Sequence, residues 1–237
     1  MGLYRTGEHP CGYYVDRIAQ DLVLDPHDPA LPDAYPIALA QGFRRSGGHV
    51  YRPKCPACNA CVPVRMRVSD FHPDRSQRRC LRDNADIDAR IVPARRTTEN
   101  FALYRHYLRA RHGDGPMADS DEDDFDQFLA SAWSPTRFME LRHDGRLLGV
   151  AVTDVTVDAM SAVYTFFDPD ERERGLGTLA VLRQIDYVQN TGRTYLYLGY
   201  WIAGHPKMDY KARFRPLETL GKTGWQTLQQ AQACMPR

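Results

Sequence analysis

The sequence predicts an α/β (α+β) fold in which a mixed, mostly antiparallel sheet is flanked by helices. The chain has 237 residues, of which 43% are hydrophobic and 26% charged, and this composition excludes a mainly disordered protein. Segments with helical and with strand-type hydrophobic periodicity both occur. Three strand-like segments in the second half are followed by one helix and one more strand, an order that favours a sheet covered by helices.

The first 96 residues predict short elements. The Pro/Asp-rich residues 25–33 predict a loop, followed by a short helix at 35–41. HVYRP at 49–53 predicts a strand. In VPVRMRV at 62–68 apolar and basic side chains alternate, which predicts a half-exposed strand with Arg65 and Arg67 on one face. Residues 76–84 predict a helix with exposed arginines.

The periodicity is stronger from residue 97 onward. Phe101, Tyr104 and Leu108 fall on one face of an amphipathic helix. Asp144-Gly145 is a strong signal for a hairpin turn between two strands. The expected elements are helices at 97–112 and 121–133, strands at 137–142, 147–155 and 160–167, a helix at 176–190 and a strand at 194–198.

Charge is distributed unevenly along the chain. The formal net charge is only +1, which taken alone argues against a nucleic-acid binder. Residues 44–96 nevertheless hold thirteen Lys and Arg against five Asp and Glu, and residues 193–222 hold six against two, whereas residues 114–126 hold seven acidic and no basic residues. A single charge run is usually a solvated surface, but two basic zones favour RNA as a partner. We expect no DNA partner.

The sequence predicts a cytoplasmic protein with reduced thiols. It contains no stretch of about 20 apolar residues and no apolar segment near the start that would predict a membrane partner or export. Cys11 and the Cys55-x-x-Cys58-x-x-Cys61 element hold four thiols that could bind a structural zinc ion or an iron–sulfur cluster. The alternative is a set of buried or redox-labile thiols without metal. Cys80 and Cys234 have no ligand pattern.

A glycine turn lies between a predicted strand and a predicted helix. The spacing Arg172-x-x-Gly175-x-Gly177 resembles the phosphate-binding turn of GNAT-type acyltransferases. Glycine lets the backbone approach a ligand closely, and N–H groups at a helix N-terminus attract phosphate oxygens. The turn therefore predicts an acyltransferase whose donor carries phosphates, either coenzyme A or the 3′ end of an aminoacyl-tRNA.

Several longer motifs resemble the aminoacyl-tRNA–protein transferases of the N-degron pathway, over residues 11 to 225. The motifs are CGYY (11–14), GFRRSG (42–47), YRPKCPACNACVPVR (51–65), SQRR (76–79), YTFFDP (164–169), GTLAVLRQI (177–185) and YLGYWIAGHPKMDYKARFRPLE (197–218). The short length and the cysteine element resemble the bacterial branch, the aspartate/glutamate leucyltransferases. Eukaryotic relatives show Cys-Gly-Tyr-Cys where this chain has Tyr14, so their metal site is not carried over whole.

The resemblance implies an N-terminal domain over residues 1–96, with the cysteines and either a GNAT-like or an irregular fold, and a GNAT-like catalytic domain over residues 97–237. It implies transfer of leucine from leucyl-tRNA to proteins that begin with Asp or Glu, which forms a peptide bond and a degradation signal. Arginine is the alternative donor residue. The aminoacyl ester is already activated, so no cofactor is required for the chemistry.

The acceptor carboxylate requires a basic clamp, and arginine suits bidentate recognition. The candidates are Arg44 and Arg45 beside Ser46, followed by Lys207 and Lys211. The candidates for orienting the amine during catalysis are Asp168 and Tyr200. The candidates for binding tRNA are Arg75, Arg78, Arg79, Arg172, Gly175 and Gly177.

Two other hypotheses stay open at this point. An acetyl-CoA acetyltransferase explains the glycine turn but not the basic N-terminal half or the cysteines. A metal-stabilised RNA-binding module without transferase activity explains the charge and the cysteines but not the acyltransferase-like turn.

Overall fold

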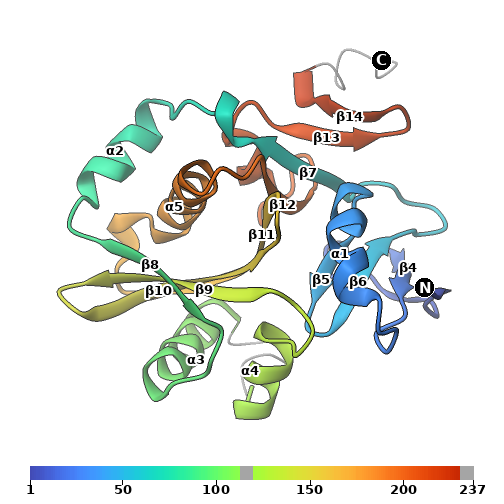
Figure 1. Cartoon of the computed structure of the whole chain (residues 1–237), viewed down its shortest axis with the longest axis horizontal. Coiled ribbons are helices and arrows are strands. Elements are labelled where there is room, and N and C mark those ends of the chain that lie inside the picture. Colours follow the sequence, from blue (N-terminus) through green and yellow to red (C-terminus); the bar gives the residue numbers. More distant parts are fainter. Residues whose placement is uncertain (113–119, 230–237) are drawn as a thin grey trace.

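An eight-stranded sheet forms the centre of the computed structural model, which describes residues 1–112 and 120–229 (Figure 1). In spatial order its strands are β14 (Gly224–Thr227), β13 (Glu218–Gly221), β7 (Val62–Arg67), β12 (Tyr195–Trp201), β11 (Ala159–Phe167), β10 (Arg146–Val155), β9 (Thr136–His143) and β8 (Asp88–Pro93). Neighbouring strands are antiparallel except β11 and β12, which are parallel. The predicted mixed, mostly antiparallel sheet flanked by helices is thus confirmed.

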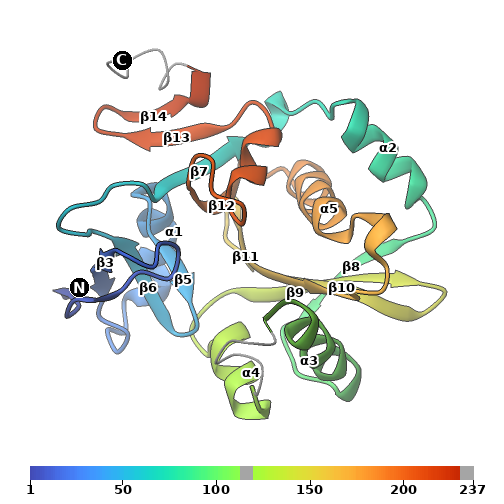
Figure 2. The ribbon, with the colours of Figure 1, turned by 180° about the vertical axis from the view of Figure 1, so that it is seen from behind.

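Helices cover both faces of this sheet. On one face α5 (Leu176–Asn190) packs on the central strands with α2 (Arg75–Asp83) beside it, and α3 (Thr98–His112) and α4 (Glu122–Leu129) lie on the other face (Figures 1 and 2). Helices α4 and α5 bury apolar side chains, such as Phe125 and Leu129 of α4 and Leu179, Leu182 and Ile185 of α5. Helix α4 ends earlier than expected, because the backbone of Ala130 is extended.

The N-terminal residues form a smaller sheet beside the main one. Its strands, in spatial order, are β1 (Leu3–Arg5), β4 (Asp21–Leu24), β6 (His49–Pro53) and β5 (Arg44–Ser46), and β2 (His9–Pro10) pairs with β3 (Ile18–Ala19). Helix α1 (Leu31–Ala40) joins the two sheets, since Leu31, Tyr35 and Leu39 share one buried cluster with Val50 of β6 and Ala159 of β11. This packing brings β5 next to β11.

Strands β7 and β8 of the first 96 residues both lie in the eight-stranded sheet. One expectation for this part of the chain needs correction. Strand β7 is not half-exposed: it lies between β12 and β13, and its Arg65 is buried over the rings of Tyr195 and Trp225. Alternation predicted the strand and its two faces, but not the elements that cover them.

In the part of the chain that the structure describes, no helix is both long and apolar enough to cross a membrane.

Candidate active site

The main sheet opens between its two parallel strands. Strands β11 and β12 pair only over Ala159–Ser161 and Tyr195–Tyr197, and beyond these residues they separate. The register of β12 against β7 shifts between Tyr197 and Gly199, where Gly199 has a φ of 76°. The gap leaves backbone groups of both strands without strand partners, and such buried groups need other hydrogen bonds.

Arg44 of β5 fills this gap. Its Nη2 donates a hydrogen bond to the carbonyl oxygen of Val163 on β11. Its guanidinium also packs against Gly199 on β12, where a Cβ atom would lie 3.2 Å from Nη1. The Nε of Arg44 is buried and has no hydrogen-bond partner. Arg44 thus brings an unsatisfied donor to the centre of the gap.

Lys211 provides a second buried cation. It lies in the short 3₁₀ helix η3 (Asp209–Arg213), and its Nζ donates a hydrogen bond to the carbonyl oxygen of Tyr200 on β12. Its side chain is only 4% exposed. Burial, and secondly the charge of Arg44, hold the pKa of Lys211 well below its usual range. The two predicted clamp residues therefore lie close enough to repel each other.

Tyrosine side chains surround this cation pair. Burial raises the pKa of Tyr13 to about 12, and it also raises the pKa of Tyr51 and of Tyr200. The phenols are therefore neutral at physiological pH and cannot balance the positive charge. Among residues 1–112 and 120–229, no carboxylate forms an ion pair with Arg44 or Lys211. The site is positive and buried, and none of the described carboxylates pairs with it.

The hydroxyl group of Tyr200 already has partners. It lies 3.1 Å from the carbonyl oxygen of Gly42 and 3.0 Å from that of Tyr51, and it is one of the least exposed groups of the chain. Its single proton is thus used by backbone acceptors. Tyr200 supports the wall of the site, and its backbone carbonyl, not its hydroxyl, is what contacts Lys211.

The other predicted clamp residues lie elsewhere. Arg45 is completely buried and bonded to Asp154, so its guanidinium is not accessible to an acceptor. Ser46 ends β5 at the turn into β6. Lys207 is exposed in the loop before η3, where its backbone N–H donates to Nδ1 of His205.

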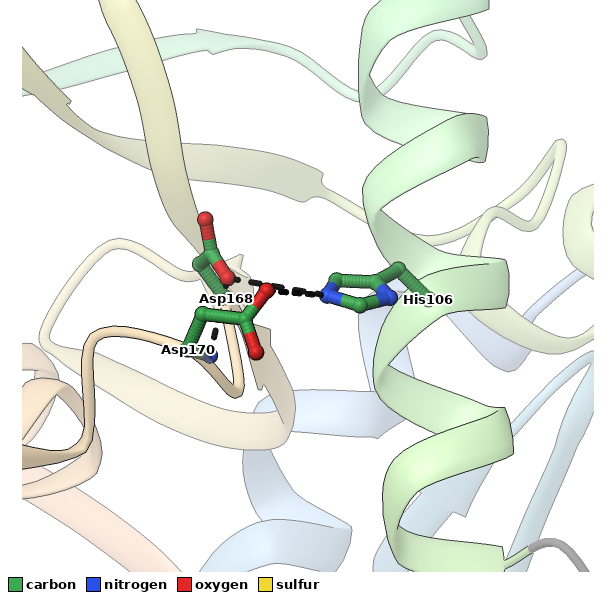
Figure 3. A group of neighbouring side chains, drawn as sticks. All are labelled: His106, Asp168 and Asp170. Atoms are coloured by element: carbon green, nitrogen blue, oxygen red, sulfur yellow. Dashed lines mark hydrogen bonds and ion pairs between the residues drawn. The ribbon is translucent and has the colours of Figure 1, made fainter.

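Asp168 lies at the end of β11 in a network of charged side chains (Figure 3). Its carboxylate forms an ion pair with Arg146 and accepts the backbone N–H of Asp170 at 3.0 Å. His106 of α3 points toward both aspartates, with Nε2 3.0 Å from Asp170 and 3.8 Å from Asp168. The ligand atoms of these three residues lie within 4.8 Å of one another. Because Asp168 already pairs with Arg146, we interpret the group as an ion-pair network that links α3 to the end of β11.

The predicted tRNA-binding residues lie together on the α2 side of the sheet. Arg75, Arg78 and Arg79 are exposed on α2. Asn84 at the end of α2 donates to the carbonyl oxygen of Arg174 at 2.8 Å, which holds α2 beside the turn between β11 and α5. The turn contains η2 (Arg172–Arg174), in which Arg172 is exposed.

The glycines of this turn shape the start of α5. Gly175 has a φ of 61°, and α5 begins at the next residue. Gly177 packs against Phe167, where a Cβ atom would lie 3.3 Å from the ring. The first N–H groups of a helix have no acceptor within it, so this exposed helix start can bind an anion.

The four clustered cysteines are partly buried neighbours. Burial and the thiols of Cys11, Cys55 and Cys58 raise the pKa of Cys61 to about 12. The backbone N–H of Ala60, and then Arg17, lower the pKa of Cys58. Four such thiols suit zinc or an iron–sulfur cluster in donor type. Among the described residues, their sulfur atoms do not form a group as tight as that of His106, Asp168 and Asp170. Cys80 lies against the turn before α5, and Cys234 lies outside the described residues.

Sequence reasoning missed the residues that connect the cysteines to the cation site. His205 contacts the rings of Tyr13 and Tyr14 edge-on, at 5.6 and 5.7 Å between centroids, and its Nε2 lies 3.2 Å from the carbonyl oxygen of Tyr13. Tyr13 and His205 are 192 residues apart in the sequence. Their only sequence signal is that both lie in motifs shared with the transferase family.

The family profiles that match the chain are those of an aminoacyltransferase. Two family profiles match the chain, "Arginine-tRNA-protein transferase, N terminus" over residues 9–79 and "Arginine-tRNA-protein transferase, C terminus" over residues 99–221. The chain belongs to the arginine-tRNA–protein transferase family, which confirms the resemblance found in its motifs.

The chain is similar to family members named aspartate/glutamate leucyltransferase. It is 58% identical to one from Stenotrophomonas maltophilia (strain R551-3), over 95% of this chain and 92% of that protein. It is 56% identical to one from Xylella fastidiosa (strain 9a5c), over 95% of this chain and 91% of that protein. Among solved structures, a C-terminal domain from Agrobacterium fabrum described as belonging to a lysylphosphatidylglycerol synthetase is similar with a TM-score of 0.51. The two are 14% identical, over 81% of this chain and 66% of that chain, so the likeness concerns the fold alone.

Proposed function

We propose that this protein transfers leucine from leucyl-tRNA to proteins whose first residue is Asp or Glu, forming a peptide bond and a degradation signal. The relatives named aspartate/glutamate leucyltransferase support this donor and these acceptors. We expect the reaction to occur in the cytoplasm. Arginine is the alternative donor residue, because the family profiles are those of arginine-tRNA–protein transferases.

The observation that carries the proposal is the pair of buried basic side chains, Arg44 and Lys211, with which no described carboxylate pairs. Arg44 keeps an unsatisfied Nε, and Lys211 lies close to it in the same gap. A buried charge is costly unless it is paired, and a carboxylate accepts guanidinium hydrogen bonds in a bidentate arrangement. The side chain of an acceptor's first Asp or Glu would supply the missing partner. Lys207, which is exposed, is suited to later residues of the acceptor.

The reaction needs positioning more than chemical activation. The α-amine of the acceptor attacks the ester carbonyl carbon of leucyl-tRNA, so that a C–N bond forms and the ester C–O bond breaks. The amine loses one proton and the ribose oxygen of the tRNA gains one. A free α-amine has a pKa of about 7.7 to 8, so it is partly neutral at physiological pH. The positive charge of Arg44 favours that neutral form.

The donor would bind where the sheet opens beside the glycine turn. Arg75, Arg78 and Arg79 on α2 suit the phosphates of the tRNA, and the start of α5 with Arg172, Gly175 and Gly177 suits a phosphate near the 3′ end. Asp168, at the end of β11 beside this turn, keeps its proposed role in orienting the amine only if the amine displaces Arg146.

The cysteines are proposed to hold a structural metal. Zinc or an iron–sulfur cluster would be bound by the thiolates of Cys11, Cys55, Cys58 and Cys61. It would connect the loop that contains Cys11 to the loop that contains the other three cysteines. Such a metal stabilises the wall formed by Tyr13 and takes no part in the transfer step. Apart from aminoacyl-tRNA, the proposed chemistry requires no cofactor.

A transfer assay tests the proposal. Labelled leucyl-tRNA and arginyl-tRNA are each incubated with the protein and with peptides that differ only in their first residue: Asp, Glu, Asn or Lys. We expect labelled product from leucyl-tRNA with the Asp and Glu peptides. If transfer occurs only from arginyl-tRNA, the donor residue is arginine and not leucine. RNA binding without any transfer would favour the RNA-binding module. Acetylation of the peptides from acetyl-CoA in preference would favour the acetyltransferase.

A further inference from the structure

Arg45 and Asp154 form a completely buried ion pair. Both side chains have no exposed surface, and their atoms meet in a two-pronged arrangement, with Nε 2.8 Å from Oδ2 and Nη2 2.9 Å from Oδ1. The two residues are 109 positions apart in the sequence. Arg45 comes from β5 of the small sheet and Asp154 from β10 of the main sheet, so the pair joins the two sheets.

The pair is fully integrated into a polar network. Asp154 also accepts hydrogen bonds from the hydroxyls of Tyr35 on α1, at 2.6 Å, and of Thr136 on β9, at 2.8 Å. Arg45 also donates to the carbonyl oxygen of Gly47 at 2.8 Å and to Thr136 at 3.1 Å. Each carboxylate oxygen therefore accepts two hydrogen bonds, and the network fixes β5 against α1, β9 and β10 at once.

The network lies directly beside the acceptor site. Side chains of consecutive strand residues point to opposite faces, so Arg45 faces the network while Arg44 enters the gap between β11 and β12. Strand β5 has only three residues and pairs with β6 alone, so its own hydrogen bonds constrain it weakly. The position of Arg44 then depends on what holds its neighbour.

We propose that Arg45 and Asp154 are positioning residues that hold Arg44 in the gap and thereby set the affinity for the acceptor carboxylate. This inference rests on the proposed function, because it takes Arg44 as the acceptor clamp. A buried ion pair is weak evidence for stability, since apolar residues of similar volume often stabilise as well. Its geometry is what an apolar pair would not reproduce, and a displacement of about 1 Å at a site can cost about a hundredfold in rate.

The test is a double-mutant cycle on transfer to an Asp-starting peptide. The variants are Asp154→Asn, Arg44→Met and the two combined. Tyr35→Phe, which removes one hydrogen bond to Asp154 and keeps the ion pair, is the milder variant in case Asp154→Asn does not fold. Thr153→Val is the matched control: Thr153 is also completely buried on β10, but it bonds to Gln184 of α5 and not to the network. Thermal denaturation measures stability for every variant.

We expect Asp154→Asn to raise the KM for the peptide about tenfold, and Tyr35→Phe to raise it less, while the KM for leucyl-tRNA stays within about twofold. Thr153→Val should lower the melting temperature and leave the peptide KM unchanged. The combined variant should be no worse than Arg44→Met, because Asp154 acts through Arg44. If Arg44→Met raises the peptide KM but the effects of the two substitutions multiply, or if the network variants leave that KM unchanged, the positioning role is refuted. If Arg44→Met itself has no effect, the acceptor clamp of the proposed function fails.

Discussion

Replacing Arg44 by methionine should selectively weaken the binding of acidic acceptors. Methionine keeps much of the length of the side chain but removes the charge and the unsatisfied Nε that we assign to the acceptor carboxylate. The acceptor's Asp or Glu would then enter a buried site that keeps Lys211 but has lost the guanidinium. The acceptor carboxylate would then lack its bidentate guanidinium partner, and most of its desolvation penalty would not be offset.

The size of the effect follows from the burial of the site. Removing one partner of a buried, hydrogen-bonded charge pair costs about 2 to 5 kcal/mol, and about 1.4 kcal/mol corresponds to a factor of ten. The ratio kcat/KM for an Asp peptide should fall about 30-fold to about 4,000-fold. The kcat/KM of Arg44→Lys should lie between those of Arg44→Met and the wild type, because lysine keeps the charge but lacks the planar guanidinium that binds a carboxylate with two hydrogen bonds. The preference for Asp over Asn as first residue should shrink accordingly.

The assay measures kcat/KM with leucyl-tRNA and with peptides starting with Asp or Asn. Arg90→Met, which removes an exposed arginine on the edge strand β8, serves as the control for the substitution itself. The loss of the hydrogen bond to Val163 can also reduce stability, by about 1 to 3 kcal/mol, so urea unfolding is measured in parallel. A variant that is folded and keeps its full preference for Asp over Asn would refute the assignment of Arg44.

Four further predictions concern the surroundings of the site. Burial lowers the pKa of Lys211, so the folded chain binds fewer protons than the unfolded chain between that lowered pKa and the usual value near 10.5. Across this pH window the free energy of unfolding of the wild type should rise with pH relative to that of Lys211→Met. Parallel curves of the two proteins would contradict the prediction. Gly199→Ala places a Cβ 3.2 Å from Nη1 of Arg44 at a φ of 76°, so it should raise the peptide KM without weakening tRNA binding. The control is Gly192→Ala, which also has a positive φ but no atom near its Cβ, and it should leave the peptide KM unchanged. Combined replacement of Arg75, Arg78 and Arg79 by alanine should weaken tRNA binding and reduce the slope of log affinity against log salt by about 2 to 3, and an unchanged slope would remove α2 from the tRNA surface. The double variant Cys58→Ser, Cys61→Ser should lose any bound metal, measured by elemental analysis, and its melting temperature should fall, whereas Cys80→Ser should keep the metal. Wild-type protein that is purified without metal and is fully stable would contradict a structural metal.

Local patterns predicted most of the elements of this fold. The stripe of Phe101, Tyr104 and Leu108 predicted α3, and the turn at Asp144-Gly145 predicted the hairpin of β9 and β10. These signals succeed because helix stripes and tight turns depend on residues close in sequence. The place of β7 between β12 and β13 depends on residues more than a hundred positions away, so its alternating pattern could not show that Arg65 is buried.

Arg44 and Arg45 of the candidate site show most clearly which properties depend on nearby sequence and which depend on distant residues. The sequence by itself determined the family, through motifs along the whole chain, and the chemistry, because an acidic acceptor requires a basic clamp. It presented two adjacent arginines that are chemically identical. Only the tertiary structure distinguishes them, because Asp154, which lies 109 residues from Arg45, pairs with it, whereas no described carboxylate reaches Arg44 in the gap between β11 and β12. An arginine's availability is a property of its neighbours in space, and the side chain alternation of a three-residue strand sends these two into opposite surroundings.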